Sequence, residues 1–117
     1  MMERRERERR GRRGEDRAAW YLRLKGWKIV ARRVKTMRGE VDIIARRGRM
    51  VAFVEVKWRE RAADLDHAID EWRLRRVAAA VEDIAHRYIR EGDDQRIDVV
   101  LLAPRHWPRH LVNVWMS

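Results

Sequence analysis

The stretch at residues 51–57, Val-Ala-Phe-Val-Glu-Val-Lys, decides the fold class of this chain. Its β-branched and aromatic side chains predict a strand, and both of its faces are largely apolar, which is typical of a sheet covered on both sides. Glu55 and Lys57 interrupt this pattern and project from the same face, about 6–7 Å apart along the strand. Charges in such a strand are costly unless they are paired or bind a metal, so they favour a functional site.

The sequence on either side of this strand predicts a mixed α/β domain with the element order αβββαββ. Four further strands are expected, at residues 28–34, 40–46, 96–103 and 110–115. Helices are expected at 14–25 and at about 65–90, where apolar side chains recur on one face. Trp20, Trp27 and Trp72 fit core or core-edge positions in this scheme. The predicted fold class is therefore α/β, with a mixed central sheet flanked by helices.

The composition indicates one domain that attracts polyanions. The chain has 117 residues, no cysteine, and 29 Lys and Arg against 19 Asp and Glu, for a formal net charge of +10. Such a charge favours nucleic acid as a partner, and a generally basic proteome is the alternative explanation. No apolar run approaches the ~20 residues of a membrane helix, and no apolar signal segment begins the chain. We therefore expect a cytoplasmic protein with no membrane partner.

Residues 1–13 differ in composition from the rest of the chain. They are nearly all Arg and Glu, with no apolar face to bury. We expect a disordered basic arm there, followed by a single domain at residues 14–117. A mixed-charge run of this kind is most often a solvated tail, although it could also contact a phosphate backbone.

Asp42, Glu55 and Lys57 form the candidate catalytic group. If the chain turns at residues 47–49, Asp42 on the preceding strand falls within a few residues of lying opposite Glu55. One or two carboxylates suffice for a hard cation such as Mg²⁺, which lowers the pKa of a bound water and stabilises charge on phosphoryl oxygens. A lysine beside it can orient the water and offset the anionic transition state. We predict Asp42 and Glu55 as ligands of Mg²⁺ or Mn²⁺, the carbonyl of Val56 as a further ligand, and Lys57 as that lysine.

Glu15 is a further acidic candidate, for which the sequence leaves two interpretations open. It lies three and four residues before Ala18 and Ala19 and so shares the inward face of the first helix. An inward carboxylate is uncommon unless it is paired or metal-bound. A carboxylate in the first turn also stabilises a helix with no metal at all. The Glu-x-Lys pattern at Glu55 also has a non-functional explanation, because solvated charges on an exposed strand produce the same pattern by chance.

Four motifs, in order, resemble those of one protein family: Gly14-Glu15 followed by Ala18, Gly39-Glu40-Val41-Asp42, Phe53-Val54-Glu55-Val56-Lys57, and Arg96-Ile97-Asp98-Val99-Val100. They resemble the YraN-like family of uncharacterised bacterial proteins, regarded as a member of the PD-(D/E)XK superfamily and similar to archaeal Holliday-junction resolvases. The resemblance runs from residue 14 to residue 114. It implies a restriction-endonuclease-like three-layer core and a catalytic triad of Asp42, Glu55 and Lys57. It also implies that Glu15 reaches the metal site, and that the protein forms a homodimer as resolvases do.

Basic side chains on either side of the acidic residues are the candidate nucleic-acid contacts. They are Arg32, Arg33, Lys35, Arg38, Arg59, Arg61 and Arg73. Two of them depart from the pattern of the relatives, in which Lys tends to stand at the position of Arg73 and Asn at that of Arg33. A third departure is Trp58, where Thr is common. Trp58 and Trp107 could stack on an unpaired base, with ordinary packing as the alternative.

These features predict a nuclease that depends on Mg²⁺ or Mn²⁺ and hydrolyses phosphodiester bonds of DNA. Branched or single-stranded DNA is suggested by the similarity to resolvases alone. The alternative is a non-catalytic nucleic-acid-binding or assembly protein on a nuclease scaffold. The presence of both carboxylates and the lysine favours the enzyme. A weaker third hypothesis, a protein-interaction module with a basic surface, predicts no metal binding and little salt-dependent affinity for DNA.

Overall fold

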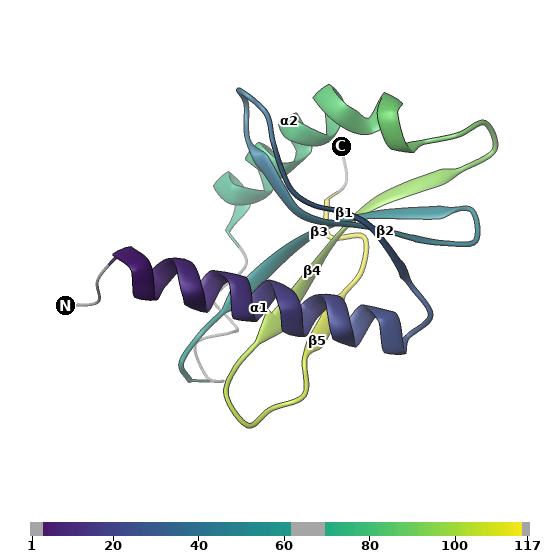
Figure 1. Cartoon of the computed structure of the whole chain (residues 1–117). Coiled ribbons are helices and arrows are strands. Elements are labelled where there is room, and N and C mark those ends of the chain that lie inside the picture. Colours follow the sequence, from purple (N-terminus) through teal and green to yellow (C-terminus); the bar gives the residue numbers. More distant parts are fainter. Residues whose placement is uncertain (1–3, 62–69, 116–117) are drawn as a thin grey trace.

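The apolar strand that contains Glu55 lies in the middle of a five-stranded sheet in the computed structural model of the chain, which describes residues 4–61 and 70–115 (Figure 1). The elements are α1 (Arg4–Leu24), β1 (Lys28–Lys35), β2 (Glu40–Arg47), β3 (Met50–Trp58), α2 (Glu71–Tyr88), β4 (Asp94–Leu102) and β5 (Arg109–Leu111). The predicted order αβββαββ is therefore confirmed.

The sheet is mixed, with the strands in the order β1-β2-β3-β4-β5. β1, β2 and β3 pair antiparallel, β3 and β4 pair parallel, and β5 pairs antiparallel with β4. The turn between β2 and β3 lies at the predicted place, where Gly48 has the positive φ of 61° that suits glycine. α2 forms the crossover between the two parallel strands, which a tight turn cannot join.

Each face of the sheet is covered by one helix, as Figure 1 shows. α1 contributes Ala18, Ala19 and Leu22 to a core with the β2, β3 and β4 side chains of that face. α2 contributes Leu74, Val77, Ala80, Val81 and Ile84 to a second core, which includes Phe53. The strands alternate between the two cores, which explains why both faces of β3 are apolar.

The N-terminal arm is the clearest departure from the sequence-based expectation. α1 begins at Arg4, so residues 4–13 are helical and not the disordered arm that was predicted. Arg and Glu have high helix propensities, and the segment extends a helix that is already fixed to the sheet by its apolar face. Residues 1–3 lie outside the described residues. Neither described helix is long and apolar enough to cross a membrane.

α2 begins later than the sequence predicted. Asp70 has an extended backbone, and its side chain accepts a hydrogen bond from the backbone N–H of Trp72, which caps the helix at Glu71. The predicted start at Leu65 lies outside the described residues. Of the three tryptophans predicted at core or core-edge positions, Trp27 is buried, whereas Trp72 is 61% exposed and Trp20 is 50% exposed, so neither of these two lies in the core.

Gly39 fixes the hairpin between β1 and β2 against α2. A Cβ at this position would overlap the carbonyl oxygen of Arg76, so only glycine allows the two backbones to approach so closely. Thr36 closes the turn, because its hydroxyl accepts hydrogen bonds from the backbone N–H groups of Arg38 and Gly39. The contact holds the start of β2, and with it Asp42, beside the first turns of α2.

Candidate active site

The candidate active site is found among the five charged residues that are buried in the described part of the chain. They are Glu15, Asp42, Glu55, Lys57 and Asp98. The first four are the acidic and basic residues that the sequence analysis singled out. Their burial removes the interpretation of Glu55 and Lys57 as solvated charges on an open strand.

Asp42 lies where β2 and β3 cease to pair as a regular ladder. The pairing runs from Arg47 and Met50 at the hairpin to Ile43 and Val54, and Asp42 and Glu55 follow directly beyond it. Here the side chain of Asp42 replaces the missing backbone acceptor, because its Oδ2 accepts a hydrogen bond of 2.8 Å from the backbone N–H of Val56. Asp42 and Glu55 are therefore neighbours at the point where β2 and β3 separate, as the hairpin geometry predicted.

Glu55 is 1% exposed and points to the α2 side of β3. Its Oε1 accepts a hydrogen bond of 2.7 Å from Nη2 of Arg73, in the first turn of α2, and lies 3.1 Å from Nζ of Lys57. Its Oε2 is buried without a hydrogen-bond partner. An orphaned carboxylate oxygen is costly in a protein interior, so this atom is the best indication of a missing positively charged ligand.

The electrostatics of Asp42 support the same conclusion. Burial and the adjacent charge of Glu55 raise the pKa of Asp42 to about 8, although the hydrogen bond from Val56 lowers it and a smaller contribution from Glu15 raises it. Two buried carboxylates that cannot both ionise easily need either a proton or a cation between them.

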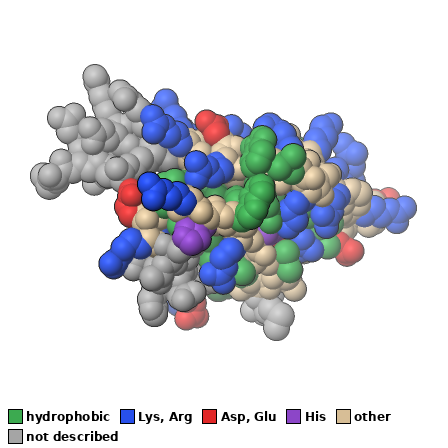
Figure 2. Space-filling view, turned by 90° about the horizontal axis from the view of Figure 1, so that it is seen from below, with side chains coloured by type: hydrophobic (Ala, Val, Ile, Leu, Met, Phe, Trp, Pro, Cys, Tyr) green, Lys and Arg blue, Asp and Glu red, His purple; other side chains and the backbone are tan. Residues whose placement is uncertain are grey.

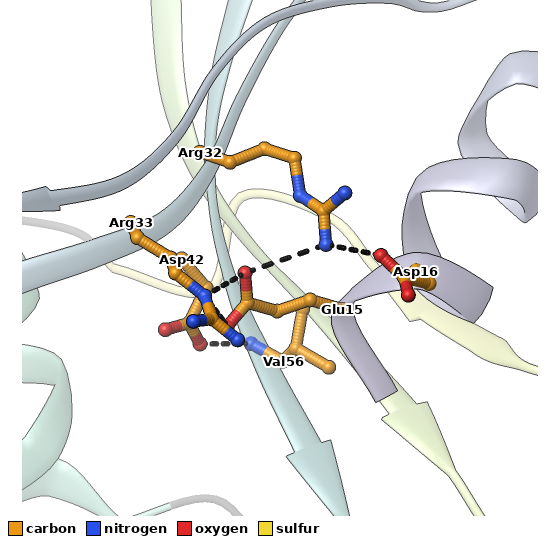
Figure 3. A network of polar contacts seen from close by, with 6 residues as sticks. All are labelled: Glu15, Asp16, Arg32, Arg33, Asp42 and Val56. Atoms are coloured by element: carbon orange, nitrogen blue, oxygen red, sulfur yellow. Dashed lines mark hydrogen bonds and ion pairs between the residues drawn. The ribbon is translucent and has the colours of Figure 1, made fainter. Parts of the chain in front are cut away.

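Glu15 reaches from α1 towards Asp42 and Arg33, as Figure 3 shows. It is buried, as its place on α1 predicted, and its two oxygens accept hydrogen bonds of 3.0 and 2.9 Å from Nε of Arg33. Arg32 lies 3.6 Å from Glu15 and 2.6 Å from Asp16. Arg33 adopts a positive φ of 54°, uncommon for a non-glycine residue. Glu15 is thus held by arginine, and its role as a metal ligand stays a prediction.

A pocket of about 360 Å³ lies beside Glu55, and Glu40, Trp72, Arg73 and Arg76 are among its lining residues. The guanidinium of Arg76 lies 5.2 Å from the centroid of the Trp72 ring. The sequence analysis missed Trp72 as a residue of this pocket because it was assigned to the apolar stripe of the helix. A helical wheel would have indicated this position. Trp72 precedes Val77 by five residues and so lies about 140° away from it around the helix, outside the buried face.

The predicted nucleic-acid contacts occupy different environments. Arg38 bonds Glu82 and Asp83 of α2, both at 3.0 Å, and so ties the β1–β2 hairpin to the helix. Arg32, Arg33 and Arg73 pair with acidic residues of the site, as described above. Lys35 and Arg61 are exposed, whereas Arg59 is half-buried and donates to the carbonyl of Trp58. The structure therefore shows that several of these cations compensate protein carboxylates.

The donor set suits a hard divalent cation. Within residues 4–61 and 70–115, no group of three or more His, Cys, Asp or Glu side chains is arranged as a metal cage. Mg²⁺ does not require one, because it retains several waters and is commonly bound by one or two carboxylates. Asp42 and the unpaired oxygen of Glu55 meet that requirement, with oxygen donors only.

Asp98, the fifth buried charge, has a different environment. It accepts hydrogen bonds from the backbone N–H of Asn113 at 2.9 Å, pairs with Arg96, and lies 2.8 Å from Nε2 of His110. Burial alone would raise its pKa, but the contacts with His110, Asn113 and Arg96 lower it. Both oxygens of Asp98 therefore have hydrogen-bond or ion-pair partners within the protein, and these contacts hold the C-terminal segment against β4.

Residues 14–102 match the family described as "Uncharacterised protein family UPF0102". The chain belongs to this family. Its members include UPF0102 proteins of Erythrobacter litoralis, 66% identical over 92% of this chain and 93% of the relative, and of Sphingopyxis alaskensis, 68% identical with the same coverage. The resemblance to the YraN-like family is thus confirmed, and it covers most of this UPF0102 chain.

The fold also matches a solved structure. Archaeoglobus fulgidus Hjc, a Holliday junction resolvase from an archaeal hyperthermophile, superposes with a TM-score of 0.58 at 21% sequence identity, over 88% of this UPF0102 chain and 72% of that chain. The UPF0102 chain therefore has the restriction-endonuclease-like fold that the sequence predicted.

Proposed function

We propose that this UPF0102 protein is a nuclease that depends on Mg²⁺ or Mn²⁺ and hydrolyses phosphodiester bonds of DNA. The single observation that carries the proposal is the buried, unpartnered Oε2 of Glu55 beside Asp42, whose pKa is raised. Such a pair binds a hard cation more readily than it tolerates two negative charges. The fold shared with a Holliday junction resolvase supports a nuclease, and branched DNA is the first substrate to test.

In this mechanism Asp42 and Glu55 would hold the cation, the carbonyl of Val56 would be a further ligand, and Glu15 would be an additional ligand at the edge of the site. When bound, the cation lowers the pKa of a water molecule and offsets negative charge on the phosphoryl oxygens. Lys57, whose Nζ is 3.1 Å from Glu55, is placed to orient the attacking water and to stabilise the anionic transition state. Attack would form a bond from the water oxygen to phosphorus and break one phosphorus–oxygen ester bond. The water would give up a proton to solvent and the leaving oxygen would take one, so the products are a phosphate monoester and a free hydroxyl.

Arg73 has a second role in this scheme. Its side chain is 42% exposed, while Glu55, its partner, is buried. A guanidinium at the mouth of the pocket can pair with a phosphate once a cation takes over the charge of Glu55. Arg and Lys are not equivalent here, because the guanidinium can bind carboxylate and phosphate oxygens in a bidentate manner.

One observation favours the alternative function, a non-catalytic nucleic-acid-binding protein. Arg33 compensates Glu15, and Arg73 with Lys57 compensates Glu55, so protein cations already neutralise part of the acidic site. A protein that uses these pairs only for stability would bind DNA through its net charge of +10 and would not require a metal.

The test combines metal binding and cleavage in one set of variants. Calorimetry with Mg²⁺ and Mn²⁺, followed by cleavage of labelled single-stranded, duplex and branched DNA, should be run on the wild type, Glu55→Gln and Lys57→Ala. We expect Glu55→Gln to lose metal binding and cleavage, and Lys57→Ala to lose cleavage but keep the metal. The matched control is Glu71→Gln, since the Glu71 side chain is 75% exposed on α2.

Two results would contradict the proposal. If the wild type binds neither metal, with or without DNA, the nuclease mechanism is wrong. If it binds DNA in a salt-dependent way but cleaves none of the three substrates, the alternative function holds. Sedimentation of the same samples tests the homodimer that the similarity to resolvases implies.

A further inference from the structure

A second pocket lies between α1 and the loop that joins β4 to β5. Its volume is about 670 Å³. From α1 it is lined by Asp16, Arg17 and Trp20, and from the loop by Arg105, His106 and Trp107. We call it the aromatic pocket. Neither the metal site nor the cores of the sheet involve its two tryptophans.

The two indole rings of this pocket are exposed and nearly parallel. Trp20 is 50% exposed and Trp107 is 71% exposed. Their centroids lie 6.3 Å apart with an angle of 6° between the planes. Exposed aromatic side chains that gather in one patch are typical of contact surfaces, because apolar area left in water is stabilised when a ligand or partner covers it. Flat aromatic faces suit planar ligands.

The surroundings of the rings carry positive charge. Arg17 and Arg105 line the pocket directly, and its acidic residue, Asp16, is neutralised by Arg32 at 2.6 Å. Figure 2 shows hydrophobic side chains gathered in a patch with Lys and Arg side chains around it. Aromatic faces among arginines are the arrangement that proteins use to hold single-stranded nucleic acid, where bases stack and phosphates meet the cations.

The aromatic pocket and the candidate active site are linked through α1. Asp16 directly follows Glu15, and Arg32 contacts both carboxylates. On the strand side, the guanidinium of Arg17 lies 5.4 Å from the centroid of the Trp58 ring, and Trp58 packs on the α1 face of β3, opposite to the face of Lys57. Trp20 lies five residues after Glu15 on α1, about 7.5 Å along the helix axis and about 140° around it. A strand with one phosphate at the carboxylates would therefore pass around α1 to bring its neighbouring nucleotides to the indoles.

We propose that the aromatic pocket binds an unpaired base of the substrate strand, so that this protein prefers DNA with a single-stranded segment over a fully paired duplex. The proposal rests on the proposed function for the identity of the phosphate site. In a duplex the bases are stacked on one another and cannot lie against Trp20 or Trp107 without being unpaired, which costs free energy. A single strand or a flap exposes them at no such cost.

The test is a binding measurement without metal, so that it does not depend on cleavage. Labelled oligothymidylate and a duplex of the same length are titrated with the wild type, Trp107→Leu and Trp20→Leu. We expect each variant to bind the single strand about five- to a hundredfold more weakly and the duplex as the wild type does. Trp107→Phe should restore most of the single-strand affinity. The control is Leu24→Ala, since Leu24 is 61% exposed on the same helix and does not line the pocket.

Unchanged single-strand affinity in both leucine variants would overturn the proposal. So would equal losses for single strand and duplex, because these would indicate a general effect on charge or folding. If the leucine variants instead reduce self-association in sedimentation while single-strand affinity stays constant, the pocket is a contact between copies of the chain and the proposal is wrong. A wild type that binds single strands through the tryptophans but cleaves no DNA with metal would support the pocket and refute the nuclease.

Discussion

Replacing Asp42 with Asn should remove a large pH dependence of the free energy of unfolding. Burial and the charge of Glu55 raise the pKa of Asp42 from 3.8 to about 8 in the folded protein. Above about pH 5 the unfolded chain has released this proton while the folded protein still holds it. The stability that the proton provides is complete below the unfolded pKa and is lost as the pH rises through the folded pKa. A proton that only the folded state holds is worth about 1.4 kcal/mol per pH unit, so the metal-free protein should lose roughly 3 kcal/mol of stability between pH 5 and pH 7.

Urea unfolding of the metal-free protein at several pH values in this window measures the effect. Asn keeps a carbonyl oxygen for the backbone N–H of Val56, so Asp42→Asn should stay folded with a pH dependence below about 1 kcal/mol. Glu71→Gln, at an exposed carboxylate on α2, should behave as the wild type does. Asp93 and Asp98 do not contribute in this window, because their lowered pKa values leave them ionised in both states. Saturating Mg²⁺ should flatten the wild-type profile by displacing the proton. Equal slopes for the wild type and Asp42→Asn would refute the reasoning.

Three further results are expected. Gly39→Ala should cost about 1–3 kcal/mol, measured by urea unfolding, because the added methyl overlaps the carbonyl of Arg76; an unchanged stability would show that the hairpin can move away from α2. Asp98→Ala should cost about 3–5 kcal/mol by leaving several buried donors without an acceptor, and Asp98→Asn should cost less; the reverse order would show that the charge itself is unfavourable. Asp93→Asn should lower the Tm near neutral pH, because hydrogen bonds from Arg46 lower the pKa of Asp93 to about 2. The deficit should shrink in calorimetric scans as the pH falls from about 4 towards 2, since the wild type loses the same contribution there.

Much of the fold could be predicted because the sequence encodes it locally. Alternation along residues 51–57 fixes the two faces of β3, and glycine at position 48 fixes the turn that brings Asp42 beside Glu55. The family motifs then supplied the three-layer architecture, which the alternation alone does not specify. The helical state of residues 4–13 was missed, because a mixed-charge run gains its helix from the packed segment that follows it and not from any face of its own.

A carboxylate in an apolar strand marks two different kinds of site in this protein. Glu55 and Asp98 each interrupt an apolar strand, and this interruption alone does not distinguish them. In the structure, Asp98 finds backbone and side-chain donors from the C-terminal segment, whereas one oxygen of Glu55 finds none. The sequence did not predict the ion pairs of Arg33 with Glu15 and of Arg38 with α2 either, because these partners are distant in sequence.

Asp42 is both a candidate metal ligand and the acceptor for the backbone N–H of Val56. These two roles predict how members of the family would change if nuclease activity were no longer under selection. Glu55 compensates Arg73 and the buried Lys57, so drift should replace it with a neutral or apolar residue once Lys57 has changed as well. Position 42 should outlast it, because losing the acceptor leaves a buried N–H unsatisfied in the sheet. Lineages that retain an acid or amide at 42 but have lost the glutamate would then be descendants that bind DNA without cutting it.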